Sequence, residues 1–227
     1  MVVPPPGLVV GVSNCCTPKG YRWVFSERMA ERDAKRYRRR GLDATSRRIV
    51  DFLKSQGVEG QTVLEVGGGI GAIQIELLKA GAARAVSVEL TPTYEDVAKS
   101  LLAEAGLSDR VERRVMDFAE AASQVEPADV VIMNRVLCCY PDMPRLAGAA
   151  ADHAVQTLVV TFPRRTWWTR SGLGIANAVL WLTRREFHIF VHRPAQIIAT
   201  SDAHGLRPVV NQPGFLWTLA ALRRSAA

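Results

Sequence analysis

A glycine-rich turn between a strand-like run and a helical run is the part of this sequence with the clearest chemistry. Residues 62–66 read Thr-Val-Leu-Glu-Val, glycines follow at Gly67, Gly68, Gly69 and Gly71, and apolar residues then recur at helical spacing. A ligand can lie against a glycine backbone because no Cβ stands in the way, and a helix start offers free N–H groups. The pattern therefore predicts a ligand site at the end of a buried strand.

Acids at the ends of the next two strand-like runs indicate a ligand that carries a nucleoside. Glu89 lies eighteen residues after Gly71, where an acid can accept hydrogen bonds from both hydroxyls of a ribose. Asp117 could accept a hydrogen bond from an adenine amino group, and Phe118 offers an apolar wall beside it. The alternative is that these acids only cap helices or lie in solvated loops.

The acid before the glycines decides between two cofactors. Residues 67–72 fit the looser dinucleotide fingerprint G-x-G-x-x-A, which alone would suggest a dinucleotide. Glu65 stands two residues before the first glycine, where it would repel a pyrophosphate. The same carboxylate would favour the cationic methionine part of S-adenosyl-L-methionine (SAM), so the sequence favours SAM.

The chain resembles the class I SAM-dependent methyltransferases from about residue 47 to residue 223. The resemblance rests on Glu65–Gly71, Glu89, Asp117-Phe118 and the strand-like run 128–136. It implies an α/β fold with a Rossmann-like seven-stranded sheet whose last strand is antiparallel. It also implies that the glycine loop holds the methionyl end, Glu89 the ribose and Asp117 the adenine. The residues that we assign to the cofactor site are Glu65, Gly67, Gly69, Gly71, Glu89, Asp117, Phe118 and Asn134.

The second half of the chain is most similar to magnesium-protoporphyrin IX methyltransferases and to a group of small actinobacterial enzymes. This narrower resemblance rests on 136–141 (Val-Leu-Cys-Cys-Tyr-Pro), 161–164 (Thr-Phe-Pro-Arg) and 190–192 (Phe-Val-His). It implies a tetrapyrrole carboxyl methyltransferase as one alternative function.

The elements that position these residues alternate between strands and helices, which predicts a parallel sheet. An N-terminal cover, 1–43, is expected to comprise an irregular segment (1–20) and a basic helix (22–40) that ends at Gly41. The catalytic domain would span 44–227 and end in a hairpin, which distinguishes it from a dehydrogenase. We expect strands near 62–66, 84–89, 111–116, 129–134, 157–162, 206–211 and 215–222, and helices near 44–56, 70–80, 92–106, 142–154 and 194–204.

Composition narrows the class of protein. The chain has 227 residues, of which 48% are hydrophobic, and neither a signal peptide nor an uncharged apolar run of 18 residues is recognised. Its four cysteines form two adjacent pairs, 15–16 and 138–139, which suit a reducing, cytoplasmic setting better than disulfides or zinc. The net charge of +7 is concentrated in 36–40 and 47–48; a solvated helix face is the first interpretation, and contact with an anionic substrate the second.

The acceptor side is expected where the fourth and fifth strands end. Tyr140 could orient the acceptor or act as an acid or base, and His192 could act as a general base. The segment 134–141 lacks the Pro-Pro of adenine-N6 methyltransferases and the Pro-Cys of RNA cytosine-C5 enzymes. We therefore expect nucleic acid not to be the substrate, and Cys138 and Cys139 either line the pocket or pack in the core.

The function predicted from the sequence is methyl transfer to a small, aromatic or apolar acceptor. A cover made of 23–37 and 167–190 would lie over that acceptor, since both segments are rich in aromatic residues. The alternatives are the tetrapyrrole enzyme, an RNA methyltransferase that uses 36–40, and a SAM-binding protein without catalysis. The apolar segment 171–183, flanked by arginines, could also contact a membrane surface. The oligomeric state and the methylated atom remain open.

Overall fold

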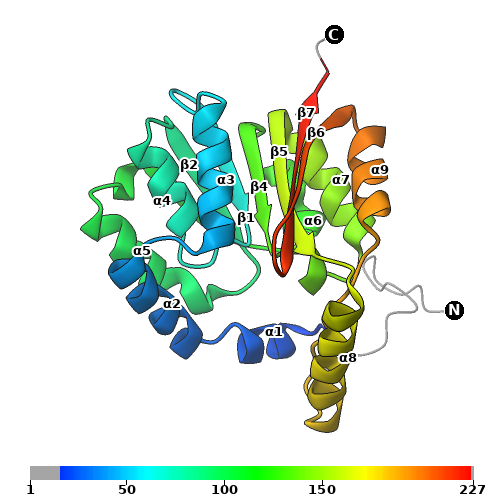
Figure 1. Ribbon diagram of the computed structural model, residues 1–227. Coiled ribbons are helices and arrows are strands. Elements are labelled where there is room, and N and C mark those ends of the chain that lie inside the picture. The colour runs from blue at the N-terminus through cyan, green and yellow to red at the C-terminus, as the bar shows by residue number, and fades with distance from the viewer. Residues whose placement is uncertain (1–15, 226–227) are drawn as a thin grey trace, which may run out of the picture.

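The computed structural model describes residues 16–225 and shows a seven-stranded sheet flanked by helices on both faces (Figure 1). The strand order is β3-β2-β1-β4-β5-β7-β6. Strands β1 to β5 pair in parallel, whereas β7 runs antiparallel to both of its neighbours, β5 and β6. The strands are β1 (Thr62–Val66), β2 (Arg84–Glu89), β3 (Val111–Val115), β4 (Ala128–Asn134), β5 (Ala154–Pro163), β6 (Leu206–Pro213) and β7 (Trp217–Arg224). The predicted sheet with its antiparallel last strand is confirmed.

The helices that connect the strands also follow the predicted alternation. Each expected helix forms within a few residues of its predicted bounds, with the expected helix at 92–106 divided into a 3₁₀ turn and an α-helix. The helices are α1 (Pro18–Val24), α2 (Glu27–Arg40), α3 (Ala44–Ser55), α4 (Ala72–Lys79), α5 (Glu95–Glu104), α6 (Phe118–Ala121), α7 (Met143–His153), α8 (Trp167–Leu182) and α9 (Pro194–Ala203), and the 3₁₀ turns are η1 (Pro92–Tyr94), η2 (Ser108–Arg110), η3 (Ala122–Gln124) and η4 (Leu137–Cys139).

Alternation along the central strands divides the core into two layers. Val63 and Val159 face α3 and α4, while their neighbours Leu64 and Val160 face α7 and α9. All four side chains are buried, which explains why the central strands read as continuous apolar runs. The sheet is thus fixed between two apolar layers, and the ends of its strands are free to carry the site.

The N-terminal segment differs from the single helix predicted over 22–40. Two helices form instead, because the chain is extended at Ser26, the N-cap of α2. Helix α1 begins earlier than expected, at Pro18, since the Thr17 hydroxyl accepts a hydrogen bond from the Gly20 amide at 3.1 Å. Figure 1 shows α1 and α2 crossing below the sheet, under the carboxyl ends of the parallel strands. Most of the predicted irregular segment 1–20 lies outside the described residues, and the domain boundary after residue 43 stays a prediction.

The C-terminal part forms the predicted hairpin, with β6 two residues longer than expected and β7 shifted by two residues toward the C-terminus. No helix within residues 16–225 has the length and apolar character needed to cross a membrane.

Candidate functional site

The glycine loop joins the end of β1 to the start of α4 and forms one wall of a cavity. Gly69 has φ +59°, a left-handed conformation that residues with a Cβ seldom adopt. Gly68 approaches Glu65 so closely that an added Cβ would lie 2.5 Å from the Cδ of that carboxylate. Gly71, with φ +76°, is the N-cap of α4. The glycines are therefore required by the path of the loop around Glu65.

Glu65 is a buried carboxylate at the base of this loop. Its Oε2 accepts a hydrogen bond from the Gln74 Nε2 at 2.9 Å. Burial raises the pKa of Glu65 to about 7, against the opposing effects of the Gln74 hydrogen bond and the Arg113 charge. A carboxylate has about four acceptor positions, so Glu65 retains capacity for a cationic or hydrogen-bonding ligand.

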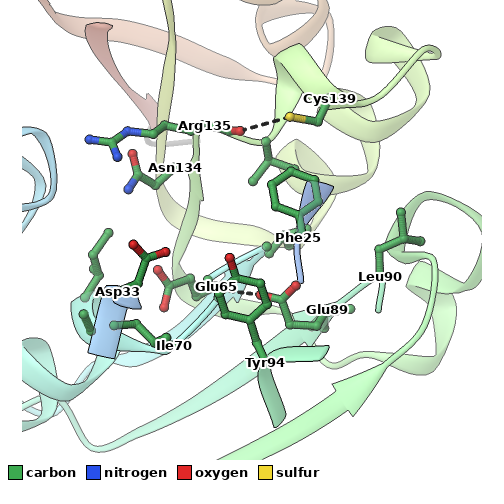
Figure 2. Close-up of a pocket in the computed structure, with 18 of the residues that line it drawn as sticks. Phe25, Asp33, Glu65, Ile70, Glu89, Leu90, Tyr94, Asn134, Arg135 and Cys139 are labelled. Carbon is green, nitrogen blue, oxygen red and sulfur yellow. Dashed lines mark hydrogen bonds between the residues drawn. The ribbon is translucent and has the colours of Figure 1, made fainter. Parts of the chain in front are cut away.

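Glu89, at the end of β2, faces the same cavity from the neighbouring strand. One of its carboxylate oxygens accepts a hydrogen bond from the Gly69 amide. Burial raises the pKa of Glu89 to about 7, while the Gly69 hydrogen bond and the Arg113 charge oppose the shift. Figure 2 shows Glu65 and Glu89 close together beside Tyr94. Two raised carboxyl pKa values in one cavity are typical of a functional site.

Arg113 supports the loop from below, and sequence reasoning missed it. Its guanidinium donates to Glu95 at 2.8 Å, to the Gly69 carbonyl at 3.2 Å and to the Ser87 hydroxyl at 3.2 Å. Its side chain is only 4% exposed. A bidentate guanidinium in this position fixes the loop and offsets part of the negative charge of Glu65 and Glu89.

Asp117 caps the short helix α6 and faces the cavity beside Tyr140. Its carboxylate accepts hydrogen bonds from the Ala119 amide at 3.0 Å and from the Tyr140 hydroxyl at 3.0 and 3.1 Å. Burial and the neighbouring Asp117 charge raise the pKa of Tyr140 well above its ordinary value. Tyr140 is therefore protonated at neutral pH and acts as a hydrogen-bond donor to Asp117. Phe118 is buried next to Asp117 and packs edge-on against His153.

Asn134, at the end of β4, lines the cavity, but the protein already uses both ends of its amide. Its Oδ1 accepts from the Thr161 hydroxyl at 2.8 Å, and its Nδ2 donates to the Ser46 hydroxyl at 3.2 Å. These bonds tie β4 to β5 and to the first turn of α3. The amide thus holds the strand ends together.

Arg135 follows directly and is a second residue that sequence reasoning missed. Its φ of +63° turns the chain sharply after β4. The guanidinium lies 2.6 Å from Asp43 and 5.3 Å from the centre of the Trp217 ring. Asp43 is in turn the N-cap of α3, because its carboxylate accepts from the Thr45 amide at 2.9 Å. Arg135 therefore connects the cover, α3 and β7.

Helices α1 and α2 provide the opposite wall of the cavity. Tyr21, Phe25 and Met29 give this wall an apolar surface, and Asp33 adds one acid whose pKa is raised by burial. The Tyr21 hydroxyl donates to the Cys139 carbonyl, which fixes α1 to the segment after β4. Figure 2 shows Phe25 and Asp33 facing the space that Glu65 borders. The cavity has a volume of about 360 Å³, which is within the range of small-molecule sites.

The model of a known protein family matches the part of the chain that carries the glycine loop and the three acids. This family, described as a methyltransferase domain, matches residues 63–156. Residues 63–156 thus carry a methyltransferase domain, in agreement with the resemblance of the sequence to the class I SAM-dependent methyltransferases. SAM is the cofactor of this family, and two buried carboxylates with unused acceptor positions suit its positive charge and its ribose hydroxyls.

Solved structures with the same fold include two methyltransferases. The magnesium protoporphyrin IX methyltransferase of Synechocystis PCC 6803 with bound SAH has a TM-score of 0.69 and 18% identity, over 90% of this chain and 100% of that protein. An O-methyltransferase family protein of Burkholderia thailandensis has a TM-score of 0.70 and 20% identity, over 94% of this chain and 65% of that protein.

A curated relative matches over a shorter region. The ribosomal protein L11 methyltransferase of Enterobacter sp. (strain 638) is 30% identical over 94 residues, which is 41% of this chain. The chain spans 31% of the length of that relative.

Most of the residues that we assigned to the methyltransferase site lie around this one cavity. The residues among them that line it are Glu65, Gly67, Gly69, Glu89, Asp117, Phe118, Asn134 and Tyr140. Gly71 and His192 do not line it. Gly71 shapes the loop from the start of α4, and the individual roles of all these residues stay predictions.

His192 lies behind Tyr140. Its Nε2 is 3.2 Å from the Tyr140 carbonyl, and its ring stacks on Phe190 at 5.6 Å. Burial lowers the pKa of His192 below its ordinary value, although hydrogen bonding to the carbonyls of Tyr140 and Leu137 opposes the shift. A neutral ring held by backbone carbonyls suits a positioning role for the 137–140 segment.

Of the two segments predicted to cover the acceptor, the first lines the cavity and the second does not. Residues of α1 and α2 line the cavity, whereas none of 167–190 does. Helix α8 projects away from the sheet (Figure 1). After it, Phe187 packs edge-on against Tyr21 and Phe25, and the Phe190 amide donates to the Cys138 carbonyl at 2.7 Å. The apolar character of 167–190 suggested a lid, but most of α8 is exposed.

The adjacent cysteines and the basic run 36–40 both make contacts within the protein. Within residues 16–225, no cluster of three or more His, Cys, Asp or Glu side chains could hold a metal ion. The sulfurs of Cys138 and Cys139 are 3.6 Å apart, and Cys139 lines the cavity. In the basic run 36–40, Arg38 pairs with Glu104 on α5 at 2.8 Å, so part of this charge is used within the protein.

Proposed function

We propose that the acceptor of this methyltransferase is a small, aromatic or apolar molecule bound between the cofactor site and the α1–α2 cover. The observation that carries the proposal is the composition of one cavity. Carboxylates of Glu65 and Glu89 lie on its sheet side, and apolar side chains of Tyr21, Phe25 and Met29 lie on its cover side. The first wall suits a cationic cofactor, and the second suits an apolar acceptor.

Methyl transfer needs little from the protein beyond close approach and exclusion of water. Bound SAM would supply an electrophilic methyl group. An acceptor nucleophile would bond to this methyl as its bond to sulfur breaks, with S-adenosylhomocysteine (SAH) as the leaving group. The protein has to hold SAM and the acceptor in line and to keep the cover closed. Two contacts support closure: the Tyr21 hydroxyl binds the Cys139 carbonyl, and the Thr93 hydroxyl binds the Phe25 carbonyl at 2.5 Å.

For the cofactor, we assign Glu89 to the ribose hydroxyls, Glu65 to the positively charged methionine part and Asp117 to the adenine amino group. Tyr140 would act through Asp117, since its hydroxyl donates to that carboxylate. Removing Glu89 as a charged acceptor should weaken SAM binding by about 1.5–3 kcal/mol.

On the acceptor side, the structure adds Asp33 to the candidates for proton transfer. Its carboxylate lines the cavity from α2, and burial raises its pKa above the ordinary value. If the nucleophile of the acceptor carries a proton, Asp33 is better placed to accept it than His192, which does not line the cavity. Tyr140 and His192 then position the segment 137–140.

An assay of radiolabelled methyl transfer tests this proposal. Purified protein is incubated with methyl-labelled SAM and a panel of phenols, fused aromatics and long-chain apolar compounds. For any acceptor that is methylated, Phe25→Ala and Met29→Ala should raise the acceptor KM while leaving the SAM Kd unchanged. Trp23→Ala is the matched control, because Trp23 belongs to the same cover but does not line the cavity.

Binding of SAM without transfer to any compound of the panel would favour the alternative of a SAM-binding protein without catalysis. Unchanged acceptor kinetics in both cavity variants would place the acceptor elsewhere.

A tetrapyrrole carboxyl methyltransferase is the second candidate. The observation in its favour is the length of the fold match to the Synechocystis enzyme, which includes 90% of this chain. A cavity of about 360 Å³ leaves little room beside a bound cofactor, so an acceptor as large as a tetrapyrrole would require the cover to open. Magnesium protoporphyrin IX is therefore included in the panel, and its methylation would select this candidate.

We further propose a reducing, cytoplasmic location, because two pairs of adjacent cysteines, 15–16 and 138–139, make a poor disulfide framework.

A further inference from the structure

Helix α8 presents an apolar face to solvent. Of its sixteen residues only Thr169 is buried. Five large apolar side chains are exposed, with exposed fractions of 80% for Trp167, 66% for Ile175, 54% for Val179, 80% for Trp181 and 75% for Leu182. Among them, residues 175, 179 and 182 recur at the i, i+4, i+7 spacing of one helix face. A single exposed apolar residue is ordinary, but a contiguous face of this kind marks a surface that contacts something apolar.

The same segment is strongly basic. Arginines stand at 164, 165, 170, 184 and 185, and the run 164–185 contains no aspartate or glutamate. The basic residues lie mainly at the two ends of α8, where Trp167 and Trp181 also stand. Tryptophan and arginine flanking an apolar face are typical of a helix that lies in the interface of an anionic membrane.

Two neighbouring elements extend this surface. In the turn between β6 and β7, Phe215 is 80% exposed and its ring lies 5.2 Å from that of Trp168. Beyond the other end of α8, the Arg185 guanidinium lies 3.8 Å over the ring of Trp23, which is itself half exposed. We call the surface formed by α8, Trp23, Phe215 and Leu216 the α8 face.

The α8 face is held firmly in place. The Asn177 side chain donates to the Ile189 carbonyl at 2.9 Å and accepts from the Ile189 amide at 2.8 Å. This amide pair anchors the inner side of α8 to the segment that follows it. The exposed side therefore projects beyond the body of the protein (Figure 1) in a fixed orientation.

We propose that the α8 face docks on the surface of an anionic lipid bilayer. Charge decides between this partner and a second copy of the chain. Two α8 faces packed together would bring two sets of five arginines into contact with no acid of the segment to neutralise them. Anionic headgroups provide that neutralisation, and the acyl region takes up the tryptophan rings.

Docking would bring the acceptor end of the molecule to the membrane. Trp23 belongs to α1, which also contributes Tyr21 to the cavity, and the buried Phe187 packs between Tyr21 and Phe25. An apolar acceptor dissolved in the bilayer could then enter beside the cover. This consequence rests on the proposed function, whereas docking itself does not.

Vesicle co-sedimentation tests the proposal with the full chain. Vesicles of phosphatidylcholine alone are compared with vesicles that also contain phosphatidylglycerol, at low salt and at ~1 M salt, where screening reduces the Debye length to about 3 Å. We expect binding to the mixed vesicles at low salt, with a loss of about tenfold or more on adding salt, since each arginine near an anionic surface contributes about fivefold.

The variants Trp167→Glu and Trp181→Glu should each weaken vesicle binding at least about tenfold. Val155→Glu is the matched control, because Val155 is 48% exposed on β5 outside the α8 face and receives the same change. SAM affinity should be unchanged in all three variants, which verifies their fold and separates this proposal from the proposed function.

Five outcomes would overturn the proposal. They are absence of binding to the mixed vesicles, equal binding to both kinds of vesicle at low salt, and equal loss in the control and the tryptophan variants. The fourth is a lipid-free dimer that Trp181→Glu dissociates in analytical ultracentrifugation, which would identify a second copy as the partner. Binding that appears only after removal of residues 1–14 would instead identify that segment as the occupant, and would also overturn it.

Discussion

The pH dependence of SAM binding provides the sharpest test of the two buried carboxylates. Burial raises the pKa of both Glu65 and Glu89 to about 7. A raised carboxyl pKa means that the group is protonated below that pH, and a cation or a hydroxyl donor binds the ionised form. Affinity should therefore increase as the pH rises through 7 and decrease as it falls.

The magnitude follows from the fraction of each carboxyl that is ionised. A group with a pKa of 7 changes from about nine-tenths ionised at pH 8 to about one-tenth at pH 6, which corresponds to about tenfold in affinity, or ~1.4 kcal/mol. If both carboxylates contact the cofactor, the change approaches about 10²-fold. Proton release on binding should rise correspondingly as the pH falls below 7.

Isothermal titration calorimetry between pH 6 and pH 8, in buffers of different ionisation enthalpy, measures both quantities. Each of the variants Glu65→Gln and Glu89→Gln should lose about one of the two tenfold changes in SAM affinity between pH 6 and pH 8. This loss distinguishes protons released by the two carboxyl groups from protons released by SAM. Glu126→Gln, an exposed residue outside the cavity, is the control. An affinity that stays constant from pH 6 to pH 8 in the unmodified protein would refute the reasoning.

Three further predictions concern the loop, the cover and the acceptor side. Gly69→Val should abolish SAM binding, measured by calorimetry, because φ is +59° and an added Cβ would already lie 3.4 Å from the Tyr94 ring; retained affinity would contradict it. Asp43→Ala should lower the free energy of unfolding by about 2 kcal/mol in denaturant titrations, since the α3 cap and the partner of Arg135 are lost together. In His192→Ala, turnover should fall with SAM affinity intact and without loss of a pKa near ~6–7 from the rate profile; loss of that pKa would instead identify His192 as a base.

The cofactor side of the site could be predicted because its determinants are local in the sequence. A parallel strand that ends in an acid places that acid at the carboxyl edge of the sheet, whatever the rest of the chain does. Glu65, Glu89 and Asp117 each follow this rule, and all three line one cavity. The glycine loop is equally local, since the turn requires left-handed backbone within three residues of β1.

The role of Arg113 in the site could not be predicted from local sequence patterns. A charged residue inside a strand-like run reads as one that points to solvent. The register of β3 on β2 places Arg113 opposite Ser87. In this position its guanidinium reaches both the Gly69 carbonyl and the Glu95 carboxylate. Contacts that depend on the pairing of strands far apart in sequence are not visible in the pattern of one strand.

The prediction that α8 covers the acceptor failed for a different reason. Sequence patterns report how apolar a helix is, and an apolar helix is normally buried, so 167–190 was expected to close over the acceptor. The structure leaves that helix exposed and closes the cavity with α1 and α2 instead. The excess of apolar residues in α8 is thus explained by a partner outside the chain better than by the site.

The acceptor side depends on contacts between distant parts of the chain, and this has a consequence for specificity. Asp33 on α2 faces Glu65 on β1, and Arg135 after β4 pairs with Asp43 before α3. These groups meet only because the break at Ser26 lets α2 lie across the strand ends. Substitutions in the cover can therefore change the acceptor while leaving the glycine loop and its acids intact. A chain of this fold can keep its cofactor and exchange its substrate, so the acceptor must be sought from the cover residues Tyr21 to Asp33.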